Sequence, residues 1–472
     1  MKLYKGYELT VGLEVHVELK TDSKIYCSCS TAFGAPPNTN VCPVCMGLPG
    51  ALPVLNRRVV DYGVKAGLAL GCTASQKSGQ DRKNYFYPDL PKGYQISQYE
   101  HPLCADGYLE IDTEAGKKRI GIERIHIEED AGKLIYGEKG ETLIDCNRCG
   151  VPLIEIVTAP DIASEEEAKD FLQKLRTVLL YLEISDCKMN EGSMRCDVNL
   201  SVHRPGAPLG QRTEIKNLNS FAFVGKAISY EYKRQVELIE EGGTVLFETL
   251  RFDEKSGKTE CMRRKESATD YRFFPDPDLP AVLLTKEQIE AIRKTIPSLP
   301  DERVALYKER YGLSDYDGRR IASEKWRADY FETAAAACSA YKPLANLVSE
   351  ELSLERACVA PGQMAVLAEL LEKGRINTAT ARRVLCDLAG REEALVEEYI
   401  EQMNLWQITD RELLFACVKE ALEANPKAAD DFLAGKKAAL KTVVGFVMKK
   451  TAGRADARLA EELALEELER QK

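Results

Sequence analysis

The feature that most constrains this chain is a strict alternation of apolar and polar side chains over residues 7–20, YELTVGLEVHVELK. A repeat of two residues predicts a β-strand whose apolar face enters a core. The opposite face carries Glu14, His16 and Glu18 side by side. For one alternating strand, the ordinary interpretation is an edge strand with a wet, charged face. Three further segments of the same character weigh against that interpretation here.

Residues 119–133, RIGIERIHIEEDAGK, also alternate, but the phase of the alternation shifts after Ile122. A phase shift within a strand predicts a β-bulge, and bulges re-aim side chains near functional sites. After the shift, His126 and Glu128 share one face, and Glu129 follows at the end of the strand.

Two more segments place polar groups on strands. Residues 152–157, PLIEIV, hold Glu155 inside an apolar run, where a carboxylate is costly unless it is paired or binds a cation. Residues 194–202 alternate again and carry on their polar face Arg195, Asp197, Asn199 and Ser201. Oxygen ligands with a few waters suit magnesium, which commonly holds the phosphates of a nucleotide. The four segments together predict a magnesium site beside a nucleotide.

Length and composition set the class of protein. The chain has 472 residues, of which 44% are hydrophobic and 30% charged, so it is long enough for several domains. No apolar run approaches the roughly 20 residues of a membrane helix. The first strand begins within a few residues of the start, without a signal peptide, so we expect a cytoplasmic protein with no membrane association. A net charge of −10 argues against a purely electrostatic binder of nucleic acid.

Four of the 15 cysteines have the spacing of a zinc site. Cys27 and Cys29 form a CxC pair, and Cys42 and Cys45 follow as CxxC, which matches four thiolates around one structural zinc ion. Such a site has no open position for chemistry. Free thiols in a loop are the alternative, and the other cysteines are expected to act as small hydrophobic residues.

Two segments have an amino-acid composition that is typical of segments that bind phosphate or RNA. Residues 80–98 interleave Arg82, Lys83 and Lys92 with aromatic residues, and their prolines predict a loop. A well-packed surface loop is the alternative. Residues 435–454 contain six Lys or Arg and no acidic residue, which suits an RNA backbone, although charge runs are commonly just solvated faces.

Helical patterns surround these segments and dominate the second half of the chain. Residues 56–70, 164–182 and 220–241 predict helices, the second of which starts with a capping box at Ser164 and Glu167. Beyond a Pro-rich stretch that ends at residue 280, the pattern is helical almost throughout.

Eight long strings extend over nearly the whole chain: GLEVHVEL at Gly12, DRKNYFYPDLPKGYQISQ at Asp81, HIEEDAGK at His126, GVPLIEIV at Gly150, EGSMRCDVN at Glu191, EIKNLNSF at Glu214, DYRFFPDPDLP at Asp270 and VGFVMKKTAGRAD at Val444. With these strings the sequence resembles the family of B subunits of aspartyl/glutamyl-tRNA(Asn/Gln) amidotransferases, the GatB family. The resemblance implies an α+β fold. It comprises a β-rich cradle domain with flanking helices at residues 1–293, an all-α helical domain at 294–405 and a small, YqeY-like, all-α tail domain at 406–472.

The resemblance also implies a reaction and partners. ATP activates the side-chain carboxylate of misacylated Glu-tRNA(Gln) or Asp-tRNA(Asn), and ammonia from a glutaminase subunit then forms the amide. The partners would be that glutaminase, which has an amidase fold, and a small third subunit, in a heterotrimer. The cradle would hold the kinase-like and transamidase site, and the helical and tail domains would bind the tRNA.

The family's site residues map onto positions of this sequence. Those that match its magnesium site are Glu14, His16, Glu129 and Glu155. Lys92 matches a position where the family's ammonia passage opens into this site, and Cys27, Cys29, Cys42 and Cys45 match a zinc knuckle. The strand pattern adds four candidates for nucleotide or metal binding: Glu128, Arg195, Asp197 and Asn199. A phosphoryl transfer to a carboxylate requires such a cation to bring two anions together.

Two other functions compete with this interpretation. A zinc-containing RNA-binding protein without catalysis would explain the cysteines and the basic tail, but not Glu14, Glu129 and Glu155. A metallohydrolase would need a zinc site with an open position, and the four histidines are far apart in the sequence. No GxSxG motif is present, so glutamine hydrolysis is expected to belong to the partner.

Overall fold

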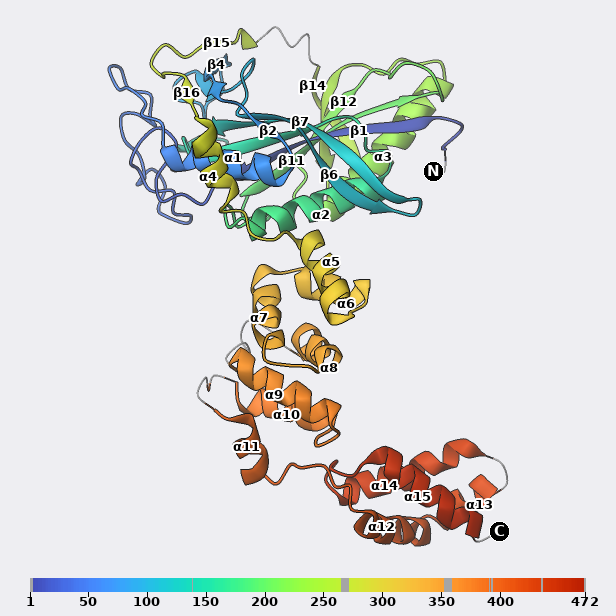
Figure 1. Cartoon of the computed structure of the whole chain (residues 1–472). Coiled ribbons are helices and arrows are strands. Elements are labelled where there is room, and N and C mark those ends of the chain that lie inside the picture. Colours follow the sequence, from blue (N-terminus) through green and yellow to red (C-terminus); the bar gives the residue numbers. More distant parts are fainter. Residues whose placement is uncertain are drawn as a thin grey trace. The chain divides into compact units, whose positions relative to one another are not determined.

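The computed structural model describes residues 3–137, 139–264, 271–351, 359–389, 391, 394–433 and 436–470. Asp270, which begins one of the motifs above, and Gly435, which begins the basic stretch, lie outside these residues. The chain forms two compact units, Met1–Leu299 and Pro300–Lys472 (Figure 1). The first unit contains the sheet and the second is helical.

A large mixed sheet organises the first unit, and the predicted first strand lies at its centre. In the described residues, the strand order is β14-β13-β12-β11-β1-β10-β7-β6-β2, with β12 and β13 parallel and all other neighbours antiparallel. The strands are β1 (Glu8–Glu18), β2 (Thr73–Ala74), β6 (Cys104–Thr113), β7 (Gly116–Glu129), β10 (Pro152–Thr158), β11 (Met194–His203), β12 (Thr213–Lys216), β13 (Glu248–Asp253) and β14 (Lys258–Arg264).

One face of this sheet forms the hydrophobic core. The odd-numbered apolar residues of β1 are buried, and they pack in one cluster with apolar residues of α1 (Arg57–Ala69), α2 (Glu165–Tyr181) and α3 (Phe221–Glu240). The three helices predicted from spacing are therefore confirmed, and Ser164 caps α2 by accepting a hydrogen bond from the Glu167 backbone. A short helix, α4 (Lys286–Arg293), packs against α1.

Helix α1 approaches the sheet closely because it carries glycine where it meets β6. A Cβ atom built at Gly67 would lie 2.4 Å from the Sγ atom of Cys104. No side chain fits at that distance, so only glycine allows α1 to cover this part of the core.

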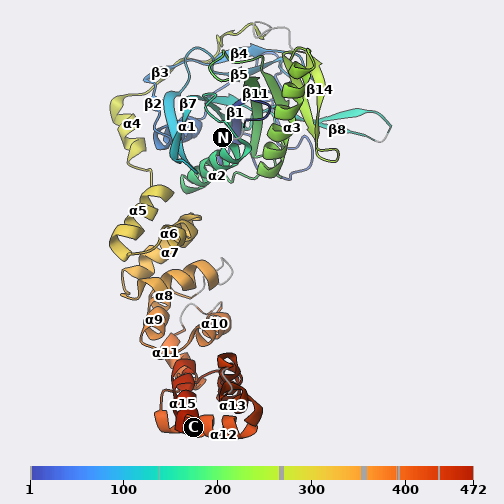
Figure 2. The same cartoon turned by 90° about the vertical axis from the view of Figure 1, so that its right-hand side faces the viewer.

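The opposite face of the sheet is polar, and short strands lie on that side. In both views β4 lies on one side of the large sheet and α2 on the other (Figures 1 and 2). The smaller sheets consist of β15 (Phe274–Pro275), β4 (Asp81–Asn84) and β5 (Tyr94–Ser97), of β16 (Val282–Leu283) and β3 (Lys77–Ser78), and of β8 (Lys133–Tyr136) and β9 (Thr142–Asp145). The expectation that residues 80–98 are all loop is wrong, because a strand precedes and another follows the proline-containing turn. Each has only four residues, too few for a periodic pattern.

The predicted bulge is present in β7. Arg124 pairs with Val157 of β10, but the next residue of β10, Thr158, pairs with Ile122. Glu123 is the extra residue, and it is the position at which the alternation changes phase. The bulge brings Ile125 and Ile127 to the core and His126 to the polar face.

Every helix or strand named in the described residues of the second unit is a helix. Its elements are α5 (Pro300–Tyr311), α6 (Asp315–Ala322), α7 (Lys325–Ala335), α8 (Tyr341–Asn346), the π-helix η2 (Leu347–Glu351), α9 (Pro361–Glu372), α10 (Thr378–Asp387), α11 (Val396–Gln402), α12 (Arg411–Ala424), α13 (Pro426–Leu433), η4 (Lys437–Ala439), α14 (Leu440–Lys450) and α15 (Ala457–Arg470). Apolar residues of α12, α14 and α15 form a core of their own. The predicted α+β fold class is confirmed, and the boundaries of the three domains stay predictions.

None of the helices in the described ranges has both the length and the apolar composition needed to span a membrane.

Candidate active site

The polar face of the large sheet gathers titratable side chains from neighbouring strands. His16 of β1 lies opposite Glu155 of β10, and Glu155 lies opposite His126 of β7. On the other side of β1, Glu14 lies opposite Asp197 of β11. Side chains alternate along a strand, so these residues all point to the same face. The four segments that share this polar pattern in the sequence are thus adjacent in the sheet.

His16, Glu128 and Glu155 form the first group, which we call the histidine–carboxylate cluster. The His16 Nε2 atom lies 3.3 Å from Glu128 Oε1 and 3.5 Å from Glu155 Oε2. One ligand atom from each of the three residues lies within 4.8 Å of the others. His126 contacts the cluster from β7, with its Nε2 atom 3.0 Å from Glu155 Oε2.

The charges of this cluster depend on one another. Although burial opposes it, the carboxylates of Glu155 and Glu128 raise the pKa of His16 to about 10 and that of His126 to about 9. Burial would raise the pKa of Glu155, but the two imidazoles hold it well below its usual range. At neutral pH the cluster therefore pairs ionised carboxylates with protonated imidazolium rings, so a metal ion that binds His16 has to displace the proton from that ring.

The second group, the acidic cluster, consists of Glu14, Asp197 and Glu214. Burial, and then the nearby carboxylates of Glu155 and Asp197, raise the pKa of Glu14. Lys216 donates a hydrogen bond to Asp197 and lies 3.2 Å from a carboxylate oxygen of Glu214. The lysine therefore balances part of the negative charge of this cluster.

A cavity of about 500 Å³ adjoins the acidic cluster, and its walls include Gly12, Glu14, Asn199 and Arg212. Asn199 donates a hydrogen bond of 2.9 Å from Nδ2 to Glu14 Oε1, which orients that carboxylate. The volume lies in the range of small-molecule sites, which usually have a few convergent polar groups.

Arg195 lies on the same face of the sheet, but its partner is a residue outside both clusters. Its Nη2 atom donates a hydrogen bond of 2.6 Å to Asp130 Oδ2 at the end of β7. Burial, and then the charge of Asp130, raise the pKa of the neighbouring Glu18 to about 8. The structure brings Arg195 to the edge of the histidine–carboxylate cluster, two residues along β11 from Asp197.

Lys83 of β4 is a further cation of this region. Its Nζ atom lies 5.0 Å from the ring centroid of Tyr271 and 5.9 Å from that of Tyr85. Burial opposes it, but the charges of Glu128 and Glu155 raise the pKa of Lys83. Within the described ranges, no acceptor lies at hydrogen-bonding distance from this ammonium.

Glu129 does not join the residues with which the sequence groups it. It follows Glu128 on β7 and points the other way, since neighbouring side chains of a strand alternate. Its carboxylate accepts hydrogen bonds from the Lys92 ammonium and from the Ile96 backbone, at 2.9 Å for the latter. Lys92 and Glu129 line a smaller cavity of about 110 Å³, whose walls also include Cys27.

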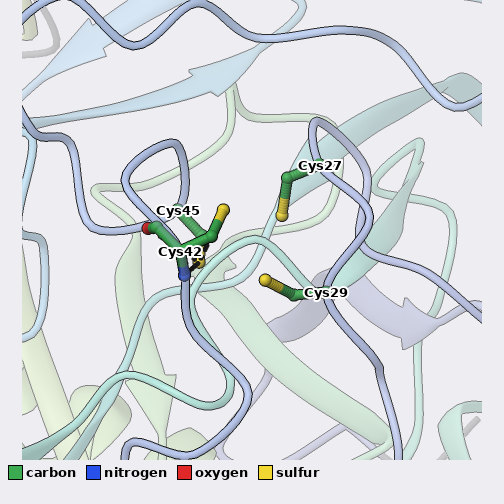
Figure 3. Close-up of side chains that lie close together, drawn as sticks. All are labelled: Cys27, Cys29, Cys42 and Cys45. Carbon is green, nitrogen blue, oxygen red and sulfur yellow. Dashed lines mark hydrogen bonds between the residues drawn. The ribbon is translucent and has the colours of Figure 1, made fainter.

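The four knuckle cysteines are brought together as predicted by their spacing. Their four sulfur atoms all lie within 4.8 Å of one another. Cys27 and Cys29 face Cys42 and Cys45 from separate loops (Figure 3). The hydrogen bond from the Cys27 thiol lowers the pKa of Cys45 to about 4.

Both kinds of site fit the ions that their residues suggest. Four sulfur atoms within 4.8 Å of one another match the ligand set of a tetrahedral zinc ion. In the histidine–carboxylate cluster, Glu128 Oε2 is buried and lacks a hydrogen-bond partner in the described part of the chain. An unsatisfied carboxylate oxygen beside a second carboxylate fits a hard divalent cation such as magnesium.

Comparison with known proteins gives the class to which this arrangement belongs. A family model described as "GatB/GatE catalytic domain" matches residues 9–290, which contain the sheet and both clusters. A second, described as "GatB domain", matches residues 328–468. The sheet with its two clusters is thus a catalytic domain of the GatB/GatE class.

Full-length relatives define the family more narrowly. The B subunits of aspartyl/glutamyl-tRNA(Asn/Gln) amidotransferases are 49% identical in Caldanaerobacter subterraneus, 48% in Caldicellulosiruptor bescii and 47% in Clostridium botulinum, each over 98% of this chain and 99% of the relative. The chain therefore belongs to the family of aspartyl/glutamyl-tRNA(Asn/Gln) amidotransferase B subunits, and the family resemblance seen in its motifs is confirmed.

Three residues of the site are absent from the predicted set. Glu214 and Lys216 belong to β12, and only the pairing of β12 with β11 reveals that they reach Asp197. His126 shares a face with Glu128 in the sequence pattern, but its contact with Glu155 depends on the register of β7 with β10. The histidines that are distant in the sequence thus meet at one carboxylate.

Proposed function

We propose that this chain is the subunit that activates and amidates the amino acid on a misacylated tRNA. ATP would phosphorylate the side-chain carboxylate of Glu-tRNA(Gln) or Asp-tRNA(Asn), and ammonia would replace the phosphate to give the amide. The observation that carries this proposal is the histidine–carboxylate cluster of His16, Glu128 and Glu155, on a sheet whose matched family belongs to tRNA amidotransferases.

The cluster supplies what the first step requires. Transfer of a phosphoryl group to a carboxylate brings two anions together, which needs positive charge between them. We assign His16, Glu128 and Glu155 as residues that would hold magnesium, whose chemistry here is to neutralise the transferring phosphoryl group. Glu14, Asp197 and Glu214 offer oxygen ligands for a second cation.

Cationic side chains around the clusters would orient the anionic substrates. Lys83 carries a positive charge that Glu128 and Glu155 favour, and it has no hydrogen-bonded partner among the described residues. We therefore assign it to a phosphate of ATP. Arg195 and Asn199 flank the two clusters, and the 500 Å³ cavity beside Asn199 is of a size for part of a nucleotide.

Lys92 and Glu129 fit the arrival of ammonia better than the binding of magnesium. They form a partly buried ion pair on the side of β7 that faces away from Glu128, and they line the small cavity beside the cysteines. A polar, enclosed position of this kind would pass ammonia and exclude bulk water. Ammonia would come from a glutaminase partner of amidase fold, which with a small third subunit completes the heterotrimer.

The helical part of the chain would bind tRNA, with a helical domain at residues 294–405 and a tail domain at 406–472. Helix α14 and the turn before it carry lysines on their exposed surface, at Lys437, Lys441 and Lys449. Such a cationic face suits phosphate contacts, although the chain as a whole is acidic. We place this activity in the cytoplasm, and we assign a structural zinc ion to Cys27, Cys29, Cys42 and Cys45.

The test is to purify the chain together with its glutaminase and small partner subunits and to assay conversion of Glu-tRNA(Gln) to Gln-tRNA(Gln). The complex should require both ATP and glutamine. The variant Glu155→Gln should lower the rate of amide formation at least about 100-fold, because it removes a proposed cation ligand, while glutamine hydrolysis by the partner persists.

Glu110→Gln is the matched control, since Glu110 lies on β6 in an exposed pair with Arg119, outside both clusters. It should leave the rate unchanged. Gln-tRNA formation by Glu155→Gln at the rate of the unmodified complex would contradict the proposal.

A further inference from the structure

Lys24 is a completely buried lysine beside the four knuckle cysteines. Its exposed fraction is 0%, and its backbone N–H donates a hydrogen bond of 3.0 Å to the carbonyl of Cys29. The backbone carbonyl of Lys24 faces the Asn56 side chain at 3.5 Å. The chain is therefore fixed on both sides of a cation that lies inside the protein.

The ammonium group uses all of its donors. Its Nζ atom lies 2.7 Å from the carbonyl oxygen of Asn40, 3.3 Å from that of Cys146 and 3.5 Å from the Sγ atom of Cys45. Three acceptors match the three N–H groups of a charged lysine, whereas a neutral amine has only two. These three contacts therefore indicate that the buried Lys24 side chain is a positively charged ammonium group.

No carboxylate balances this charge directly. In the ranges that the structure describes, Lys24 has no acidic partner within ion-pair distance. The carboxylate of Glu129 lines the same cavity, but it is paired with Lys92. A buried ammonium without a counter-charge is costly, so the negative charge has to come from the sulfur side.

The cysteines supply that charge when they hold a divalent ion. Four thiolates around one zinc ion have a net charge of −2, and one ammonium reduces it to −1. A hydrogen bond from Lys24 to Cys45 also lowers the electron density on that sulfur atom, as outer groups commonly do around metal ligands.

We propose that Lys24 is the charge-balancing residue of the knuckle and sets how tightly its four cysteines hold a divalent metal ion. The inference rests on the assignment of zinc to these cysteines, and it goes beyond the amidation reaction. Lys24 also joins the two loops that carry the knuckle and the Cys146 segment, because it donates to both Asn40 and Cys146. Lys24, Cys27 and Cys45 lie in the wall of the small cavity that Lys92 and Glu129 also line.

The experiment measures zinc retention in the full chain, purified with its partner subunits. Zinc content is determined first, and the rate of zinc release to a chromogenic chelator is then compared between variants. Lys24→Met should release zinc at least about tenfold faster than the unmodified chain. Lys24→Arg keeps the charge and should stay within about threefold of it. Lys20→Met is the matched control, because Lys20 is an exposed lysine close to Lys24 in the sequence, just after the end of β1.

The outcomes separate the two assignments. An unmodified chain without zinc would overturn the zinc assignment and this inference with it. A zinc-loaded chain whose Lys24→Met variant releases the ion at the unmodified rate would overturn the role of Lys24 alone. If Lys24→Met does not fold, Lys24→Gln, which keeps two donors and loses the charge, is measured in its place with the same expected and contradicting results. Cobalt substitution provides a second readout, since the thiolate-to-cobalt absorption should shift in the charge-free variants and not in Lys20→Met.

Discussion

At the scale of single residues, the contact between His126 and Glu155 affects how the site can bind a metal ion. Its Nε2 atom lies 3.0 Å from the carboxylate of Glu155, and its ring is buried among the strands of the polar face. A carboxylate that binds a metal ion keeps its orientation when further side chains also hold its oxygen atoms in place. We therefore interpret His126 as the residue that orients Glu155 toward His16.

This interpretation predicts the effect of one substitution. His126→Ala should weaken the binding of Mn²⁺, used as a spectroscopic substitute for magnesium, by about tenfold to 100-fold, because Glu155 loses its orienting partner. Electron paramagnetic resonance of free Mn²⁺ measures the affinity. His203→Ala is the control, since His203 contacts Thr10 at the far end of β11. Equal Mn²⁺ affinity in His126→Ala and the unmodified chain would exclude this role.

At the same scale, the sequence predicts which faces the polar side chains occupy but not which of them meet. Alternation alone is enough to place Glu14 and His16 on one face of β1. The partners of Glu128 and Glu129 could not be predicted in this way, because both are acidic residues at the end of the same strand. Only the structure shows that Glu128 contacts His16 and that Glu129 contacts Lys92.

At the scale of elements, local signals predict helices well and short strands poorly. Ser164 and the spacing after it are sufficient to predict α2, and the phase shift after Ile122 is sufficient to predict the bulge. Strand β12 has four residues, and its position depends on contacts with β11 and β13 that no local pattern encodes. The acidic cluster could not be completed from sequence for this reason.

Helix α6 offers a test of how one capped element contributes to stability. Asp317 is buried and accepts hydrogen bonds of 2.6 Å from Ser314 Oγ and from the Lys342 ammonium. Burial opposes it, but these two contacts hold the pKa of Asp317 below its usual value. A carboxyl group with a lowered pKa in the folded state stabilises the fold above its unfolded pKa and loses that effect as the pH falls through the folded value.

Asp317→Asn should therefore lower the free energy of unfolding by about 1 to 2 kcal/mol at pH 7. The difference should stay constant down to about pH 5 and shrink below about pH 4, because the Asp317 carboxyl group of the unfolded chain, with its ordinary pKa, then takes up a proton before that of the folded chain does. Urea unfolding followed by tryptophan fluorescence measures it, because both tryptophans, Trp326 and Trp406, belong to the second unit. Asp315→Asn, on the exposed side of α6, should change little. A difference between Asp317→Asn and the unmodified chain that persists unchanged at pH 3 would contradict the assignment.

At the scale of the whole molecule, the chain combines an acidic composition with local cationic surfaces. The net charge is −10, yet α14 exposes lysines, and Lys83 lies against a face of carboxylates. This distribution fits the proposed roles, in which the first unit handles a nucleotide and its cation and the second unit contacts the tRNA. It weighs against a protein that binds RNA by charge alone. The metallohydrolase alternative would require an open zinc position, whereas the cysteines that match zinc provide four protein ligands.

The central claim is that the histidine–carboxylate cluster supports activation of a carboxylate by ATP, and hydroxylamine tests it directly. In the absence of glutamine, hydroxylamine attacks an acyl phosphate and forms a stable hydroxamate on the tRNA, with release of phosphate. The purified complex should form this hydroxamate from Glu-tRNA(Gln) only with ATP and magnesium. The Glu128→Gln complex should form at least about 100-fold less hydroxamate, and the Glu110→Gln complex should form as much as the unmodified complex. Equal hydroxamate formation by Glu128→Gln and the unmodified complex would contradict the account.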